Sequence, residues 1–445
     1  RIGLDAVAWA RPYRNVDFRG PSPEAVSDVL AAGDVVRFRR HADGRLELSQ
    51  QPDVQGAFVS VDPQDGAIVA LVGGYSFAQS AYNRATQSAR QPGSSMKPFI
   101  YSAALENGFT LASIVNDSAI VESSDALESR WTVENYDGRY HGEVSLRYAL
   151  RTSINTVATK VLRAVGVPRT IEHLRRIGFD RDATPNDASL ALGSGGLAPV
   201  ELAGAYAVLA NGGFRVTPYF IQRIETANGQ LLYDSRLSVE TVRDVCDVDV
   251  AAGQKPALIE RKADIYPPLR CPERVLSKQN VFLVTDVLKD VIQRGSGRRV
   301  RDAFPNRRDL AGKTGTTNGP RDAWFAGFNG DVVGVAWVGF DDDTRPLGNT
   351  EQGGVTAIPI FVGYMREALA GQPENALPQP PGIVEHRINL QSGLIANDTN
   401  PNTEWEFFEV GKEPERERGV SFGAGGVPGS SVPQGGAPTE SDIFN

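Results

Sequence analysis

The sequence predicts an α+β fold, in which one antiparallel sheet assembled from distant segments packs against a helical part. Two strands, at 57–61 and 67–72, are joined by a stretch of Asp, Pro and Gly residues that favours a tight turn. From 94 to 212, apolar residues recur mostly at three- and four-residue spacing, which indicates helices. Residues 332–340 form a nearly continuous apolar run, which is typical of a central strand buried on both faces.

The remaining segments complete this order of elements. Short β-like stretches within 1–56 suggest part of a small β module, and 213–234 suggest further strands. Helices are expected at 278–293 and 358–369. A site between the sheet and the helical part is therefore the expected location of any chemistry.

Two segments are expected to lie outside this core. The stretch 235–275 is charged, contains Pro and both cysteines, and is expected to be a surface excursion. The tail from about 413 is rich in Glu and Arg and then in Gly, Ser and Pro, so we expect it to be disordered.

The composition excludes several classes of function. Lys and Arg number 46 against 54 Asp and Glu, and the net charge of −8 argues against a general nucleic-acid binder. The apolar fraction of 41% is that of a globular protein with a large core. The few histidines and cysteines lie too far apart for a local zinc motif, so we expect no metal and no cofactor. They are His41, His141, His173, His386, Cys246 and Cys271.

The sequence contains no apolar run near the roughly 20 residues that cross a bilayer. It begins with neither an initiator methionine nor a signal-peptide pattern, so we expect a soluble fragment or a processed product. A bridge between Cys246 and Cys271 would stabilise the fold by about 3 kcal/mol. The residues alone leave a disulfide and two free buried thiols equally open.

The first candidate site segment surrounds Ser94. Pro98 has no N–H and fits only the first turn of a helix, so a helix should begin close to Ser94. Free N–H groups and the helix dipole would then favour an anion at the Ser94 oxygen. Lys97 would project from the same face and could reach that hydroxyl, which pairs a nucleophile with a base. The alternative is a helix cap followed by a solvated lysine.

The second segment contains Ser153 and Asn155. Polar residues interrupt an otherwise amphipathic helical pattern here, and Ser and Asn compete with helix by bonding the local backbone. A helix junction or short loop is therefore expected, with a hydroxyl and an amide that could face one cleft. The alternative is ordinary helix capping.

The third segment runs from Lys313 to Thr317 and precedes strong strand sequence. It would place a cation and several hydroxyls along one strand, with Gly315 where a ligand or a neighbouring backbone comes close. A nucleotide-binding loop is excluded, because that motif needs glycine at the position of Arg307.

Ser-x-x-Lys, Ser-x-Asn and Lys-Thr-Gly in this order form the signature of penicillin-recognising serine enzymes. The chain resembles the transpeptidase part of class A penicillin-binding proteins of the 1A type. Met96 stands where phenylalanine or isoleucine is commoner in that family. The likeness extends over Arg90 to Pro98, Asn135-Tyr136, Tyr140, Gly142, Gly193-Ser194, Glu201 to Ala203, Ala210 to Gly213, Gly312 to Asn318 and Asp322 to Phe325.

The resemblance implies a domain organisation. Residues 1–56 would be the partial OB-like module, 57–412 the transpeptidase domain with the fold of penicillin-recognising serine enzymes, and 413–445 the disordered tail. The family's membrane anchor and glycosyltransferase domain have no counterpart in this sequence.

The resemblance also implies a reaction, the cross-linking of D-Ala-D-Ala stem peptides through an acyl-enzyme on Ser94 that β-lactams also form. Lys97 would be the base, made partly neutral by burial and by the second cation, Lys313. Ser153 would relay a proton to the leaving amine, and Asn155 would tether Lys97 and the substrate amide.

Lys313, Thr314 and Thr316 would hold the substrate's terminal carboxylate, and Gly315 and Thr317 complete the expected binding segment. The oxyanion hole is expected to consist of the backbone N–H groups of Ser94 and Thr316.

The partners implied are peptidoglycan stem peptides, β-lactams and either an outer-membrane lipoprotein activator or other cell-wall synthesis proteins. No nucleic acid is expected. The implied location is the periplasmic face of the bacterial inner membrane, reached through an N-terminal anchor absent from this chain. An oxidising periplasm would favour a disulfide between Cys246 and Cys271. A serine β-lactamase-like hydrolase and a non-catalytic cell-wall scaffold are the alternatives.

Overall fold

A five-stranded antiparallel sheet lies at the centre of the molecule, in the order β11-β12-β13-β3-β4. The computed structural model describes residues 2–122, 131–234, 272–317, 319–397 and 400–418. The α+β prediction is confirmed, because strands from distant parts of the sequence form one antiparallel sheet that packs against helices. Its strands are β3 (Gln55–Val61), β4 (Ile68–Val72), β11 (Ala311–Thr316), β12 (Asp322–Phe328) and β13 (Val333–Gly339).

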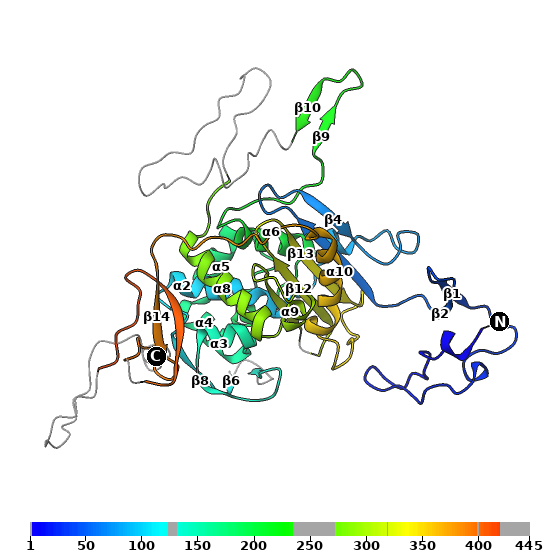
Figure 1. Cartoon of the computed structure of the whole chain (residues 1–445), viewed down its shortest axis with the longest axis horizontal. Helices are drawn as coiled ribbons and strands as arrows, with labels where there is room; N and C mark the ends of the chain where they lie inside the picture. The colour runs from blue at the N-terminus through cyan, green and yellow to red at the C-terminus, as the bar shows by residue number, and fades with distance from the viewer. Residues whose placement is uncertain (1, 123–130, 235–271, 318, 398–399, 419–445) are drawn as a thin grey trace.

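Both faces of this sheet are covered, which explains the continuous apolar run in β13. Alternate residues point to opposite faces of a strand. Val59 and Val335 join the core cluster that contains α6 (Pro199–Ala210), whereas Phe58 and Ala336 join a second cluster with α10 (Ile358–Ala368). Figure 1 shows β13 between these two helices.

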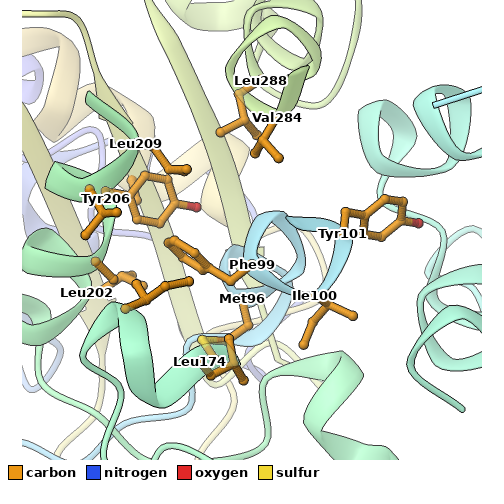
Figure 2. Packing of buried hydrophobic residues seen from close by; sticks show 14 of the residues in the cluster. Met96, Phe99, Ile100, Tyr101, Leu174, Leu202, Tyr206, Leu209, Val284 and Leu288 are labelled. Atoms are coloured by element: carbon orange, nitrogen blue, oxygen red, sulfur yellow. The ribbon is translucent and has the colours of Figure 1, made fainter. Parts of the chain in front are cut away.

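The helical part surrounds one central helix, α2. Phe99 of α2 meets Tyr206 of α6 edge to face, with ring centroids 5.3 Å apart. Figure 2 shows side chains of α5, α6 and α8 around this pair, so α2 is held on several sides. The helices are α1 (Arg84–Gln87), α2 (Lys97–Glu106), α3 (Leu146–Thr152), α4 (Asn155–Val165), α5 (Val167–Ile177), α6, α8 (Lys278–Arg294), α9 (Arg298–Ala303) and α10.

Two-stranded sheets and short helical turns lie outside the central sheet and the main helices. Four of these strands fall inside the stretch that the apolar spacing marks as mostly helical, because strands of three or four residues are too short to set a period. The pairs are β1 (Arg37–Arg40) with β2 (Leu46–Ser49), β5 (Ile114–Asp117) with β8 (Gly142–Ser145), β6 (Ile120–Glu122) with β7 (Trp131–Val133), β9 (Arg223–Glu225) with β10 (Leu231–Asp234), and β14 (Ile383–Asn389) with β15 (Thr403–Glu409). Among the described residues, the 3-10 helices are η1 (Leu4–Ala6), η2 (Val26–Asp28), η3 (Gly93–Met96) and η4 (Ala188–Leu192), and η6 (Gly353–Ala357) is a π-helix.

Some expectations lie outside the described residues. These are the state of Cys246 and Cys271, most of the 235–275 excursion and the expected disordered tail beyond 418. The first residues of that expected tail, 413–418, are described and pair with the body of the protein, because Arg416 forms a bridge with Ile395. Within the described residues, no helix has the length and apolar character needed to span a membrane.

A buried ionic cluster attaches the C-terminal strand pair to the helical part. The guanidinium of Arg147 on α3 lies 2.7 Å from the carboxylate of Glu406 on β15, and 2.5 and 2.8 Å from Asp286 and Asp290 on α8. The side chains of Arg147 and Glu406 are only 8% and 1% exposed. Asp290 also accepts from Arg294, which is 48% exposed. The cluster thus connects three distant elements through one buried cation.

Replacing Arg147 should be far more costly than replacing Arg294, although both pair with Asp290. Arg147→Met leaves a buried carboxylate without its cation, and we expect the free energy of unfolding to fall by about 3–5 kcal/mol. Arg294→Met removes partly exposed ion pairs with Asp290 and Glu404 and should cost only about 1 kcal/mol. Chemical denaturation of both variants measures the difference. Equal losses would show that the buried cluster contributes no more than a surface pair.

Candidate active site

The segment that carries Ser94 is held by contacts from two elements. Gly93 adopts φ +57, and a tight turn then runs to Met96 before α2 begins at Lys97. Tyr206 donates to the Ser95 carbonyl at 2.9 Å, and the Trp324 indole donates to the Gln91 carbonyl at 2.8 Å. The core helix α6 and the strand β12 therefore fix the position of this turn.

Ser153 occupies a strained junction between α3 and α4, as the polar interruption in the sequence predicts. Its φ of 67 and ψ of 39 lie in the left-handed region, where it is the only non-glycine residue with positive φ among those described. This conformation costs about 1–2 kcal/mol. Strain of this kind is typical of functional sites, where the surrounding structure enforces it.

Asn155 is held in a single orientation. Its side-chain amide donates to the Glu134 carbonyl at 2.8 Å, which turns its oxygen toward the amine of Lys97 at 2.7 Å. Its backbone N–H donates to the side-chain oxygen of Asn135 at 2.9 Å. Asn135 thereby caps α4, which has no side-chain cap from its own N-cap residue.

Asp117 supports this junction through hydrogen bonds, and the sequence motifs did not predict that role. Its buried carboxylate accepts from Asn135 at 2.8 Å, from Thr156 and from His141 at 2.8 Å. Burial would raise the pKa of Asp117, but these hydrogen bonds outweigh it and hold the pKa below 3.8. No local pattern could have revealed this role, because its partners lie on other segments of the chain.

Lys97 is fully buried and faces the second motif. Its amine lies 2.7 Å from the Ser153 carbonyl, 3.2 Å from the Ile154 carbonyl and 3.3 Å from the Ser153 hydroxyl. The sequence suggested that Lys97 could reach the Ser94 hydroxyl, but no hydrogen bond joins these two described residues. The α-helix begins at Lys97 itself, and Ser94 lies in the preceding tight turn.

A second buried amine, that of Lys313 on β11, shares the Ser153 hydroxyl. Lys313 donates to this hydroxyl at 2.8 Å and to the Thr314 carbonyl at 3.1 Å. Burial lowers the pKa of Lys313 to about 7. Burial, and secondarily the charge of Lys313, lowers the pKa of Lys97 well below 10.5. The Lys313 amine can therefore exchange its proton near neutral pH, and the Lys97 amine releases its proton more readily than an exposed lysine does.

Glycines allow the Ser94 turn to pack directly against β11. A Cβ on Gly93 would lie 2.7 Å from the Thr316 carbonyl oxygen, and one on Gly315 would overlap the Pro92 carbonyl. Gly93 also donates its N–H to the Gly193 carbonyl at 3.2 Å. This close backbone approach brings the Ser94 and Thr316 segments together, as the third motif led us to expect.

These segments surround a cleft of about 560 Å³ between the sheet edge and the helical part. All three motifs contribute to its lining, and Lys97 and Lys313 lie buried behind it. The hydroxyl of Thr317 accepts from the N–H groups of Arg321 and Asp322, and this fixes the end of β11. The lining includes Ser94, Ser153, Asn155, Thr314, Thr316 and Thr317. Within the described residues, no group of three His, Cys, Asp or Glu could hold a metal ion.

The arrangement suits nucleophilic acyl transfer. It places a half-buried serine hydroxyl at a cleft beside a hydroxyl that contacts two amines of lowered pKa. Nucleophilic catalysis by a serine requires groups that can accept and return the proton of its hydroxyl.

Two family models match the chain in succession. The one described as the penicillin-binding protein transpeptidase domain matches residues 56–357, and the one described as the penicillin-binding protein OB-like domain matches residues 1–54. Among curated relatives, penicillin-binding protein 1A of Pseudomonas aeruginosa is 42% identical over all of this chain and 55% of the relative. That of Escherichia coli K12 is 37% identical over 94% of this chain and 54% of the relative. The chain spans about half the length of these relatives.

Solved structures show the same likeness. Penicillin-binding protein 1A from Haemophilus influenzae superposes with a TM-score of 0.77 at 38% identity, covering 86% of this chain and 57% of that one. PonA1 from Mycobacterium tuberculosis gives 0.59 at 26% identity, covering 74% and 81%. Its complex with penicillin V gives 0.58. With the transpeptidase model matching more than half of its residues, the chain belongs to the penicillin-binding protein transpeptidase family.

Proposed function

We propose that this chain is a peptidoglycan DD-transpeptidase, which joins stem peptides through an acyl-enzyme on Ser94. The observation that carries the proposal is the pair of buried amines, Lys97 and Lys313, on one Ser153 hydroxyl at the Ser94 cleft. Membership of the transpeptidase family supports the same reaction.

In the acylation step, the Ser94 hydroxyl oxygen attacks the carbonyl carbon of the penultimate D-Ala. Lys97 in its neutral form accepts the hydroxyl proton, since its lowered pKa makes that form accessible. The Ser153 hydroxyl, in contact with both amines, passes its proton to the nitrogen of the departing D-Ala and takes up the proton that Lys97 received. The C–N bond breaks and an ester to Ser94 remains.

In the second step, a neutral amine of a neighbouring stem peptide attacks the Ser94 ester. A new amide bond forms, the ester bond breaks, and the proton that the attacking amine loses is returned to the Ser94 oxygen. Asn155 holds Lys97 in place for both steps, because its oxygen is fixed 2.7 Å from the amine. Asp117 and Asn135 are positioning residues, since they reach the reacting groups only through this junction.

Backbone N–H groups of Ser94 and Thr316 are the proposed oxyanion hole, with each donor contributing on the order of 3 kcal/mol to transition-state stability. The close packing of Gly93 on Thr316 supports this pairing. Thr314, Thr316 and the charge of Lys313 would bind the terminal carboxylate, with Gly315 and Thr317 completing the binding segment.

The wider setting is also a proposal. The complex of the relative PonA1 with penicillin V supports β-lactams as ligands of this chain, through the same ester at Ser94. A periplasmic location, an outer-membrane lipoprotein activator or other cell-wall synthesis proteins as partners, and the division at 57 and 412 remain proposals from the family resemblance.

A penicillin adduct should form at Ser94. Incubation of the chain with benzylpenicillin is expected to raise its intact mass by one penicillin, and peptide mapping should place the adduct on Ser94. The Ser94→Ala variant should show no mass shift, while Ser95→Ala, which changes the adjacent hydroxyl bonded to the Pro92 carbonyl, should keep it. Labelling that survives Ser94→Ala would contradict the assignment of the nucleophile.

The rate of adduct formation should fall as the pH falls through the pKa of Lys97, because the protonated amine cannot accept the Ser94 proton. Since that pKa is lowered, the acid-side fall in rate should lie well below pH 10.5. Lys313→Met removes a charge that lowers the pKa of Lys97. The acid-side fall in rate, normalised to its plateau value, should therefore move to higher pH. The exposed-site control Lys278→Met should leave it in place. A rate that does not depend on pH on the acid side would contradict Lys97 as the base.

The fate of the ester separates a transpeptidase from a β-lactamase. With a chromogenic cephalosporin, we expect one burst of about one equivalent per chain and then little turnover, measured by absorbance. Continuous hydrolysis would instead favour the β-lactamase-like alternative, and the absence of both burst and turnover would favour the non-catalytic scaffold.

A further inference from the structure

We propose that Ser296 is an additional recognition residue for the free terminal carboxylate of the substrate. This inference rests on the proposed function and assigns a residue outside the three motifs. Ser296 is exposed and lines the cleft, and its hydroxyl oxygen lies 2.7 Å from that of Thr314. The sequence marks Gly295-Ser296-Gly297 only as a turn that ends a helix.

The fold presents Ser296 to the cleft through a rigid turn after α8. The N–H groups of Gly295 and Gly297 both donate to the Val291 carbonyl, at 3.1 and 2.9 Å. A Cβ on Gly295 would lie 2.5 Å from the Arg151 carbonyl of α3, so no larger residue fits there. The flanking glycines thus face the interior while the serine between them faces the cleft.

A second element covers the other side of this turn. A Cβ on Gly354, in the η6 turn, would lie 3.2 Å from the Ser296 carbonyl and 3.7 Å from the Thr314 methyl carbon. Ser296 is therefore placed by α8, by β11 and by η6 together. Such support is what a precise binding residue needs, because loosely held side chains lose affinity to conformational entropy.

Proton counting shows what the two hydroxyls can offer. Each hydroxyl has one O–H donor, and one of the two is used in the bond between Ser296 and Thr314. Whichever way that bond runs, the pair keeps one O–H donor for another acceptor. Both residues line the cleft, so this donor is available to a carboxylate there.

The groups that neighbour Ser296 make hydroxyl donors important for binding a carboxylate on the β11 side of the cleft. The Lys313 amine already donates to Ser153 and to the Thr314 carbonyl. The Thr316 hydroxyl accepts from the Gly353 N–H at 3.2 Å, which leaves its own O–H to donate. Thr314 and Thr316 share one face of β11, since they are two residues apart on a strand. Ser296 extends this line of hydroxyls beyond the strand.

The test compares a ligand that has the carboxylate with one that lacks its charge. Second-order rates of Ser94 acylation are measured by intact mass with benzylpenicillin and with its methyl ester. For Ser296→Ala we expect about a tenfold slower reaction with the acid, the size of a charged hydrogen bond, and little change with the ester. Ser296→Thr, which keeps the hydroxyl, should restore the preference for the acid.

The matched control is Ser113→Ala, which removes the serine of another serine–threonine hydroxyl pair, that with Thr110 at 3.3 Å. It should leave both rates unchanged. Equal losses for acid and ester in Ser296→Ala, or no loss for the acid, would overturn the inference. If the ester acylates too slowly to measure, the loss with the acid and its recovery in Ser296→Thr decide the question. Failure of the proposed function is separate, because the unaltered chain would then form no adduct at all.

Discussion

Two amines buried against a single hydroxyl set the requirements for the rest of this site. Lys97 and Lys313 are both fully buried, and each donates to the oxygen of Ser153. Two buried cations this close repel each other and lose their hydration, and this lowers the pKa of Lys97. The fold therefore places two amines of lowered pKa behind the cleft that Ser94 lines, without using any histidine.

The surrounding structure resists the tendency of this pair to separate. Asn155 holds one amine, and the Asp117 carboxylate fixes Asn155 through Asn135. On the other side, β11 carries Lys313 and packs directly on the turn that contains Ser94, through glycine. The left-handed conformation of Ser153 is the local strain that accompanies this arrangement. Rigid support on both sides keeps the amines within reach of one oxygen.

The sequence predicted the sheet hairpin, the buried central strand and all three motif segments, because each depends on local spacing of apolar or polar residues. It also predicted the break between two helices at Ser153. It could not predict Asp117 as a support, because that carboxylate gains its role from partners on three other segments. Nor could it place Ser296 beside Thr314, since a helix-ending turn has the same local pattern wherever it packs.

The Arg147 cluster shows that the end of the family model and the end of the packed structure are different boundaries. The transpeptidase family model ends at residue 357, yet the carboxylate that accompanies the buried guanidinium comes from Glu406 on β15. Arg147 belongs to α3, the same helix that ends at the strained serine. A shortened version that stopped at the recognisable family boundary would therefore carry an exposed seam along α3 and α8. The packed unit therefore extends beyond the residues that the transpeptidase family model matches.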